Sequence, residues 1–264
     1  MYAHVIISIF CYTEIMEKVF IESSIGEMLA AVVHRPQSIT EKLAILCPGY
    51  LDTKDYDHLR MLAHDLADKG YTVVRFDPTG TWESGGSIAH YTTTQYLADV
   101  KSVLDYMLLE HPFTFVLLGG HSRGGMVSIL YGAKDARISK IFAIMPSSGR
   151  SLLGGKDKLW KEAGFKISTR DIPNSNEQKT FTVPYSHLQD RVQFDVVSVI
   201  KNIHVPITLV AGEMDSLVLP EDVKEFYEQA NEPKKFILLD SISHSYRHSD
   251  EEIRKVNNYI LEDF

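Results

Sequence analysis

Short apolar runs alternate along this chain with longer segments in which apolar residues recur at helical spacing. Near the start, Lys18–Glu22 and Glu27–His34 read as strands, and the polar turn Ser23-Ser24-Ile25-Gly26 between them is typical of an antiparallel hairpin. The next run, Leu43–Cys47, is unbroken, as expected of a strand that is buried on both faces. It ends at Pro48-Gly49.

From that point strands and helices alternate to the end of the chain. Helices are predicted at Tyr56–Lys69, Thr94–Glu110, Met126–Tyr131, Val192–Ile200, Pro220–Ala230 and Asp250–Leu261. Further strands are predicted at Thr72–Asp77, Phe113–Leu118, Ile141–Met145, Ile207–Ala211 and Lys235–Asp240. This order predicts an α/β protein with a mostly parallel sheet of eight strands, an antiparallel N-terminal hairpin and helices on both faces.

Two segments do not follow this alternation. Residues 147–195 are rich in charged residues and carry few apolar residues at regular spacing, and a loop of this length inside a compact domain is usually functional or disordered. Residues 1–15 precede the regular pattern and are expected to be a disordered or loosely attached extension, with Met16 as an alternative start of the working chain. We therefore expect one domain at 16–264.

Composition limits the function classes. The 264 residues carry a net charge of −8 without a cluster of basic residues, which argues against a nucleic-acid partner. No stretch approaches the roughly 20 apolar residues that span a bilayer, so no membrane segment is expected. Cys11 and Cys47 show no metal-ligand spacing, and such sparse cysteine usage is compatible with a cytoplasmic protein. No cofactor and no metal are expected, and the sequence leaves open whether the chain is a monomer or a homodimer.

The strongest chemical signal is a G-x-S-x-G motif between a strand-like and a helix-like run. Gly120 lies two residues before Ser122 and Gly124 lies two residues after it. A serine on a sharp strand-to-helix turn adopts a strained backbone, and its flanks pass too close to neighbouring chain to carry a Cβ. The motif therefore predicts a nucleophile elbow with Ser122 as the nucleophile, at the positive N-terminal end of a helix.

A serine hydroxyl needs a general base, and the base needs an orienting acid. In a parallel sheet both are expected just beyond the carboxyl ends of strands. Asp215 follows the Ile207–Ala211 strand, and His244 follows the Lys235–Asp240 strand. The order Ser122, Asp215, His244 is the serine, acid, histidine order of this architecture.

Other residues compete for these roles. Glu213 and Asp240 are also near strand ends, and His248 is near His244 but falls at the start of the last predicted helix. We predict Asp215 as the acid and His244 as the base.

The oxyanion of an acyl-transfer intermediate needs preorganised N–H donors. One is expected from the backbone amide of Arg123, the residue after the nucleophile. The second is expected from the loop after the Leu43–Cys47 strand, where Pro48 has no N–H and Gly49 permits close approach, so Tyr50 is the predicted donor. The alternative is that Pro48-Gly49 is only a tight turn.

These stretches resemble the α/β-hydrolase superfamily over nearly the whole chain, and within it the serine esterase and acyl-peptidase-like branch that includes bacterial cinnamoyl and feruloyl esterases. The resemblance rests on Pro48-Gly49-Tyr50, the Val74–Asp77 strand with its glycine-rich loop, Gly120–Gly125, Gly212–Asp215 and Ser243-His244. It implies nucleophile Ser122, acid Asp215 and base His244. It also implies that 147–195 is a cap inserted after the sixth strand, whose polar character suggests a partly open or mobile lid.

Two departures from the family pattern stand out. Pro48-Gly49 replaces the usual His-Gly before the oxyanion donor, and Trp82 adds bulk to the glycine-rich loop after Asp77.

The sequence therefore predicts a serine hydrolase that cleaves a small-molecule carboxylic ester through an acyl-enzyme. An amide or peptide hydrolase with the same triad is the enzymatic alternative, and a thioester is a further possible substrate. A non-catalytic binding protein with this fold is the alternative from another class.

Overall fold

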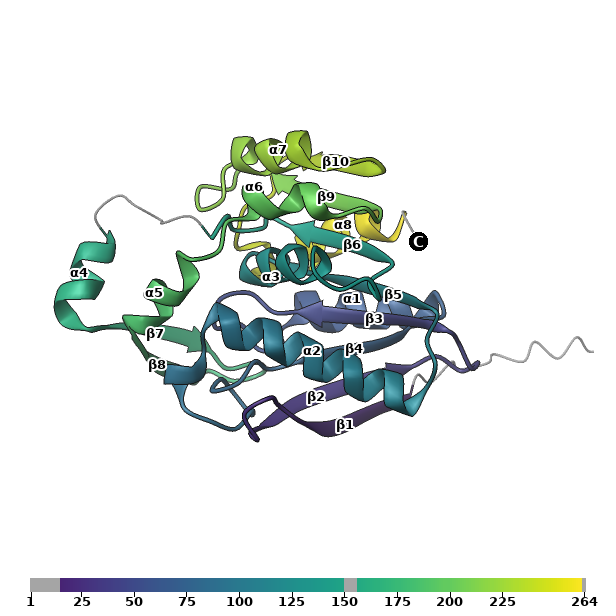
Figure 1. Cartoon of the computed structure of the whole chain (residues 1–264), viewed down its shortest axis with the longest axis horizontal. Coiled ribbons are helices and arrows are strands. Elements are labelled where there is room, and N and C mark those ends of the chain that lie inside the picture. The colour runs from purple at the N-terminus through teal and green to yellow at the C-terminus, as the bar shows by residue number, and fades with distance from the viewer. Residues whose placement is uncertain (1–14, 150–155, 263–264) are drawn as a thin grey trace, which may run out of the picture.

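A computed structural model describes residues 15–149 and 156–262. Eight strands form one sheet in the order β1-β2-β4-β3-β5-β6-β9-β10, and its strands stack from β1 at the bottom to β10 at the top of Figure 1. Six of them run parallel, whereas β2 pairs antiparallel with both β1 and β4. The predicted α/β-hydrolase fold, with its antiparallel N-terminal hairpin and eight-stranded sheet, is confirmed. The strands are β1 (Ile15–Glu22), β2 (Met28–Arg35), β3 (Lys42–Cys47), β4 (Thr72–Phe76), β5 (Phe115–His121), β6 (Lys140–Ile144), β9 (Ile207–Gly212) and β10 (Lys234–Leu239).

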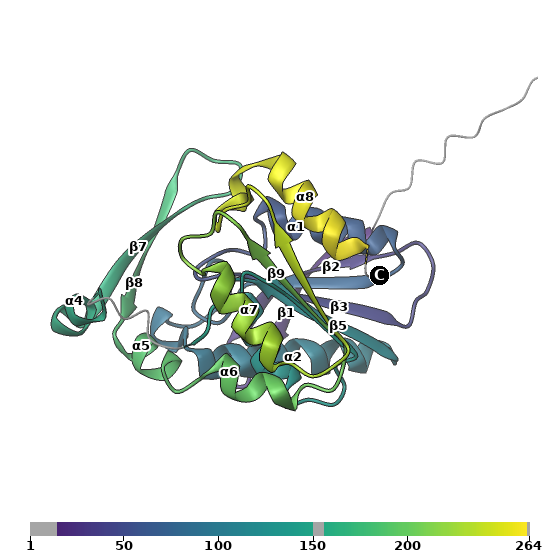
Figure 2. The ribbon, with the colours of Figure 1, turned by 90° about the horizontal axis from the view of Figure 1, so that it is seen from above.

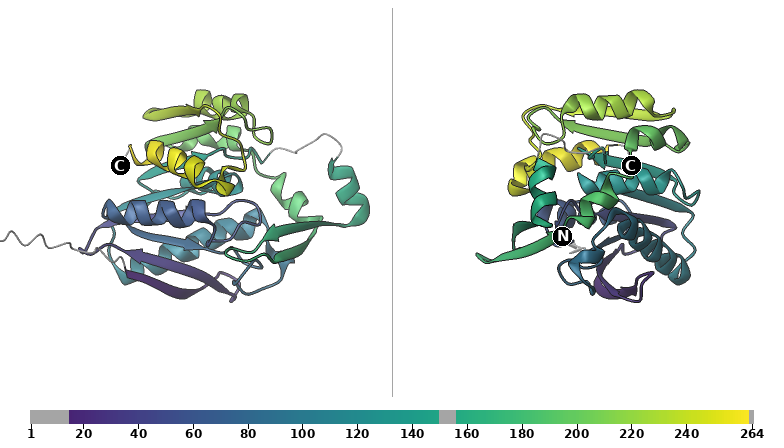
Figure 3. Two further views of the ribbon diagram at one scale, coloured as in Figure 1. Left: turned by 180° about the vertical axis from the view of Figure 1, so that it is seen from behind. Right: turned by 60° about the vertical axis from the view of Figure 1, so that its left-hand side comes forward.

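Helices cover both faces of the sheet, as Figures 1 and 3 show from opposite sides. Apolar residues of α2, α3, α6 and α7 pack with one face of the sheet into a single buried cluster, and those of α1 and α8 form a second cluster with the other face. The helices are α1 (Asp57–Asp68), α2 (Thr93–Glu110), α3 (Arg123–Gly132), α6 (Val196–Val199), α7 (Pro220–Gln229) and α8 (Asp250–Leu261). None of the helices in the described ranges has the length and apolar character needed to cross a bilayer.

Local chemistry explains the helix ends that the sequence predicts well. In α1, Leu59, Leu62 and Leu66 are buried on one stripe. Gly70 follows the helix with φ +82°, the left-handed conformation in which many helices end. In α8, the Ser249 side chain accepts a hydrogen bond from the Glu252 amide, which fixes the start of the helix. The boundaries predicted for α8 match the observed ones.

The two ends of β5 differ from the prediction. The predicted strand Phe113–Leu118 begins two residues later and continues through Gly119 and Gly120 to His121. Gly119 pairs with Phe142 of β6, and a Cβ on Gly119 would lie 2.2 Å from the Phe142 ring. The glycines are therefore required by close packing inside the strand, whereas the sequence pattern placed them in a turn.

The region after β6, the sixth strand, also differs from the prediction. Its described part contains α4 (Lys156–Ala163), a separate two-stranded sheet of β7 (Phe165–Asp171) and β8 (Gln178–Pro184), and α5 (Ser186–Arg191). The predicted helix Val192–Ile200 is wrong in extent: Asp195 accepts a hydrogen bond from the Val197 amide, so α6 begins at Val196 and gives way to a 3-10 turn, η2 (Ile200–Asn202).

This inserted region lies to one side of the sheet, at the left of Figure 1 and again in the view from above in Figure 2. Phe181 and Val183 of β8 are buried together with Leu51 and Tyr91, and Trp82 packs against that cluster. A short 3-10 turn, η1 (Ile88–His90), precedes Tyr91. The boundaries 147–195 for the cap and 16–264 for the domain remain predictions, and residues 1–14 of the predicted extension lie outside the described residues.

Candidate active site

Ser122 lies on the turn between β5 and α3 with φ 54° and ψ −113°, a strained backbone for a residue with a Cβ. Its amide donates to the Ile144 carbonyl at 2.8 Å, and its carbonyl accepts from Met126 in the first turn of α3. The turn is thus held from both sides, and the hydroxyl is presented at the carboxyl ends of the strands.

The flanking glycines are needed because the loop after β3 passes directly over the elbow. A Cβ on Gly124 would lie 1.9 Å from the Cys47 carbonyl oxygen, and one on Gly120 would lie 2.2 Å from the same atom. Real side chains do not tolerate such contacts, so the loop that begins at Pro48 can approach Ser122 only with glycine at both positions.

Ser122, His244 and Asp215 are brought together from three separate loops. The Ser122 hydroxyl lies 2.9 Å from His244 Nε2, and His244 Nδ1 lies 2.7 Å from Asp215 Oδ2. Asp215 follows β9, and His244 follows β10. In the neutral imidazole, Nδ1–H donates to the carboxylate and Nε2 accepts from the serine hydroxyl, which is the arrangement a general base requires.

The Asp215 carboxylate is fixed by its own loop. Its Oδ1 accepts hydrogen bonds from the Leu217 and Val218 amides at 2.8 and 2.9 Å. Burial tends to raise the pKa of Asp215, but the hydrogen bonds from His244 and from the two amides outweigh burial, so its pKa lies below the ordinary value. The acid therefore stays ionised next to the histidine.

The competing residues are engaged elsewhere. Glu213 accepts from the Ser241 amide, and Asp240 forms an exposed ion pair with Lys255. His248 ends a 3-10 turn, η3 (Tyr246–His248), before α8. None of the three contacts Ser122 in the described part of the chain.

The two predicted oxyanion donors lie on the expected elements. Arg123 is the first residue of α3, where a backbone N–H has no partner within the helix. In the loop after β3, the Leu51 amide donates to the Tyr91 hydroxyl and the Asp52 amide donates to the Gly49 carbonyl, whereas the Tyr50 amide makes no hydrogen bond to a described residue. The loop thus leaves Tyr50 N–H available, in keeping with its proposed role.

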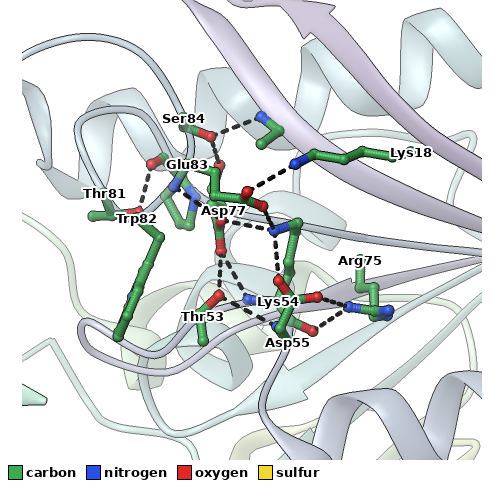
Figure 4. A network of polar contacts seen from close by, with 12 residues as sticks. Lys18, Thr53, Lys54, Asp55, Arg75, Asp77, Thr81, Trp82, Glu83 and Ser84 are labelled. Carbon is green, nitrogen blue, oxygen red and sulfur yellow. Dashed lines mark hydrogen bonds and ion pairs between the residues drawn. The ribbon is translucent and has the colours of Figure 1, made fainter. Parts of the chain in front are cut away.

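A buried polar network stabilises the loop after β3, and Figure 4 shows this network in close-up. The Lys54 ammonium is fully buried and pairs with Asp77 at 3.2 Å, with Asp55 at 2.7 Å and with Glu83. Asp77 also accepts from the Lys54 amide at 2.8 Å and from the Thr53 hydroxyl at 3.0 Å. Burial alone would lower the pKa of Lys54, but the carboxylates around it raise that pKa to about 12.

We expect Lys54→Met to lower the free energy of unfolding by about 3–5 kcal/mol, because it leaves Asp77 as an unpaired buried charge. Chemical denaturation measures the change. Lys18→Met is the matched control: Lys18 pairs with the exposed side of the same network through Glu83, and its loss should cost less than about 1 kcal/mol. Equal effects of the two substitutions would contradict the buried-pair explanation.

Residues of the inserted region reach the elbow, and the sequence analysis missed them. The Arg123 guanidinium lies 4.2 Å from the Tyr91 ring centre and donates to the His187 ring of α5 at 2.7 Å. His187 packs edge-on against Tyr50 at 5.3 Å and stacks on Trp160 of α4 at 5.7 Å. Burial and the Arg123 charge hold the pKa of His187 well below its ordinary value. Nothing in the polar sequence around His187 marks it as a buried contact.

Fold and geometry together define an α/β-hydrolase-fold protein with a serine, a histidine and an acid at the carboxyl ends of its strands. The family model described as serine aminopeptidase, S33, matches residues 39–193, so the chain belongs to this family of serine hydrolases. The matched stretch contains the predicted oxyanion loop and the turn that carries Ser122, and it ends before Asp215.

Two curated relatives extend the comparison. The chain is 24% identical over 180 residues to the mitochondrial palmitoyl-protein thioesterase ABHD10 of Rattus norvegicus and 26% identical to that of Mus musculus. Each match covers 66% of this chain and 59% of the relative's length.

Solved structures share the fold over nearly the whole chain. Est1E from Butyrivibrio proteoclasticus, with ferulic acid bound, has a TM-score of 0.73 and 20% identity and covers 92% of this chain and 98% of its own. GrgF, an α/β hydrolase from Penicillium sp. sh18, has a TM-score of 0.76 and 19% identity, with 94% and 97% of the two chains covered.

Proposed function

We propose that this protein hydrolyses a carboxylic ester by the serine mechanism. The observation that carries the proposal is the continuous chain of hydrogen-bond distances from Asp215 through His244 to Ser122. A hydroxyl at 2.9 Å from an imidazole nitrogen, on a strained turn at a helix N-terminus, is the geometry that activates a serine nucleophile.

In the proposed reaction, the Ser122 Oγ attacks the acyl carbonyl while His244 Nε2 takes its proton. The carbonyl oxygen becomes an oxyanion, which accepts hydrogen bonds from the Arg123 and Tyr50 amides. His244 then gives its proton to the leaving alcohol, and the acyl group remains on Ser122. Water, deprotonated by the same histidine, releases the acid and restores the serine.

Asp215 has two effects on this cycle. Its carboxylate fixes the histidine tautomer that leaves Nε2 free to accept a proton, and its negative charge stabilises the imidazolium that forms. The amides of Leu217 and Val218 keep the carboxylate oriented, since they occupy its other oxygen.

The residues beside the elbow bear on the acyl group. Aromatic rings of Tyr50, Tyr91 and Trp160 gather around His187 beside the elbow. Tyr50 and Trp160 are only half-buried, and they favour a substrate with an apolar or aromatic acyl group. The ABHD10 relatives are thioesterases by name and Est1E binds ferulic acid, whereas the family description is of an aminopeptidase. We favour an oxygen ester, with an amide and a thioester as the alternatives that the same proton transfer from His244 would serve.

A fluorophosphonate probe tests the nucleophile, and a substrate panel tests the substrate class. We expect the probe to label Ser122 in the folded chain, and labelling to be lost after denaturation. We expect turnover of p-nitrophenyl esters and a feruloyl ester to exceed that of aminoacyl anilides and of an acyl thioester. Absence of a Ser122 adduct would exclude the serine mechanism, and faster anilide cleavage would move the assignment to an amide hydrolase.

A further inference from the structure

A second group of polar side chains lies buried behind the proposed active site. Asp52 belongs to the loop after β3, His58 to the first turn of α1, and His121 is the last residue of β5. All three are buried. Asp52 Oδ2 lies 4.0 Å from His58 Nε2 and 3.9 Å from His121 Nδ1. One carboxylate oxygen therefore faces two imidazole nitrogens from separate elements.

The imidazole nitrogens of this group lack hydrogen bonds. Neither ring nitrogen of His58, and neither of His121, has a hydrogen-bond partner among the described residues, and all four atoms are buried. The two rings are instead held by aromatic packing: each lies edge-on to Tyr246, at 5.7 and 5.1 Å, and they lie edge-on to each other at 5.7 Å. A buried polar atom without a partner is costly, so two such histidines facing one carboxylate require an explanation.

The spacing of the three groups suits a metal ion. One ligand atom from each residue lies within 4.8 Å of the others. Ligand atoms this close together need only a small inward shift to make the roughly 2.0–2.2 Å bonds that Zn²⁺ forms with histidine and aspartate. The other carboxylate oxygen, Oδ1, lies 3.9 Å from Arg247 Nε, which keeps Oδ2 turned toward the histidines.

We propose that Asp52, His58 and His121 form a binding site for a divalent transition-metal ion, with Zn²⁺ as the reference ion. Two imidazoles and one carboxylate suit Zn²⁺ and its first-row neighbours, whereas Mg²⁺ and Ca²⁺ prefer all-oxygen sites. The spacing of these residues in the sequence gives no metal motif, because the loop after β3 and the end of β5 meet only in the folded sheet.

The position of the site links metal binding to catalysis. His121 directly precedes Ser122, and its ring centre lies 4.7 Å from that of His244. Asp52 belongs to the loop that carries Tyr50. A bound dication opposes formation of the His244 imidazolium by charge repulsion, and it pulls on the loop of Asp52, which also carries Tyr50. We therefore expect a bound metal ion to inhibit hydrolysis. This inhibition rests on the proposed function, but metal binding itself does not depend on it.

Equilibrium dialysis of the metal-free full chain against Zn²⁺, with elemental analysis, tests the site directly. We expect one equivalent to bind, and Co²⁺ in its place to give the visible absorption of a nitrogen- and oxygen-coordinated ion. His58→Phe keeps the aromatic packing but removes a ligand, and it should weaken Zn²⁺ binding by more than about 100-fold. Removing a residue that only hydrogen-bonds to a metal ligand costs less, about 10- to 100-fold. Asp52→Asn provides a second variant, in case the first perturbs folding.

His64→Phe is the matched control, since His64 is an exposed histidine on the same helix, 3.8 Å from Asp68. It should bind Zn²⁺ as the wild type does. A wild-type chain that binds no metal, or equal binding by His58→Phe, would overturn the proposal. If Zn²⁺ binds as expected but no ester is hydrolysed under any condition, the site stands and the proposed function fails.

Discussion

Replacing Ser122 with alanine should lower kcat for p-nitrophenyl acetate hydrolysis by about 10⁶-fold, the loss seen when a triad nucleophile is removed. The substitution deletes the atom that attacks the acyl carbon of the ester in the first step of the proposed mechanism. It leaves the Ile144 and Met126 backbone hydrogen bonds of the turn in place, so the fold should persist. Steady-state kinetics and thermal unfolding measure the two effects separately.

Two further variants sharpen this test. Ser198→Ala removes an exposed hydroxyl of α6 that donates to the Asp195 carbonyl, and it should leave activity unchanged and lower the free energy of unfolding by no more than about 1 kcal/mol. Ser122→Gly should be as inactive as Ser122→Ala but more stable, because glycine adopts φ 54° without the strain that a Cβ imposes. An active Ser122→Ala enzyme would show that another nucleophile is used.

The sheet could be predicted because its strands are buried on both faces. Such strands read as unbroken apolar runs, and Ile207–Gly212 is fully buried along its whole length. The pattern failed at the end of β5, where Gly119 and Gly120 look like turn residues. Their role depends on the Phe142 ring and the Cys47 carbonyl, which only the folded sheet brings near.

The inserted region could not be predicted, because few of its residues face the core. Along β7 and β8 only Ser168, Phe181 and Val183 are buried, and the apolar Phe165 and Ile167 of β7 are exposed, so the short alternation of apolar and polar residues in these strands does not follow burial. That the inserted region is a partly open or mobile lid stays a prediction. In the structure Tyr56 Oη lies 2.8 Å from the Asp171 carbonyl, and Asp171 forms a two-pronged ion pair with Arg247. These contacts join the β7–β8 hairpin of the inserted region to the segments that carry Tyr56 and Arg247.

The candidate site was easier to predict than its surroundings. Topology alone dictates where the nucleophile, acid and base can lie, since active sites of open α/β sheets form at the carboxyl ends of strands. The chain order Ser122, Asp215, His244 follows from it. Asp52, His121 and His187 were missed because each acts through a contact between distant segments, and no local pattern records such a contact.

Replacing Asp215 with asparagine should lower kcat by about 10⁴-fold with little change in structure, because the amide favours the wrong histidine tautomer. Asparagine can donate to His244 Nδ1, which moves the ring proton to Nε2, where it blocks proton transfer from Ser122. Because the pKa of Asp215 lies below its ordinary value of about 3.9, the wild-type acid is ionised at every pH above about 4. Wild-type and variant kcat should therefore be compared at neutral pH, where the wild-type acid is ionised.

The competing acids provide matched controls for this substitution. Glu213→Gln and Asp240→Asn remove carboxylates from the same two strand-end loops, yet neither group contacts His244, so each should keep kcat within about threefold of the wild type. The ionised Asp215 contributes stability above the unfolded-state pKa, and that contribution is lost as pH falls through the lower folded-state value. The difference in the free energy of unfolding between the wild type and Asp215→Asn should therefore become smaller only below about pH 4. If Glu213→Gln or Asp240→Asn caused the larger loss of kcat, the acid would have to be reassigned.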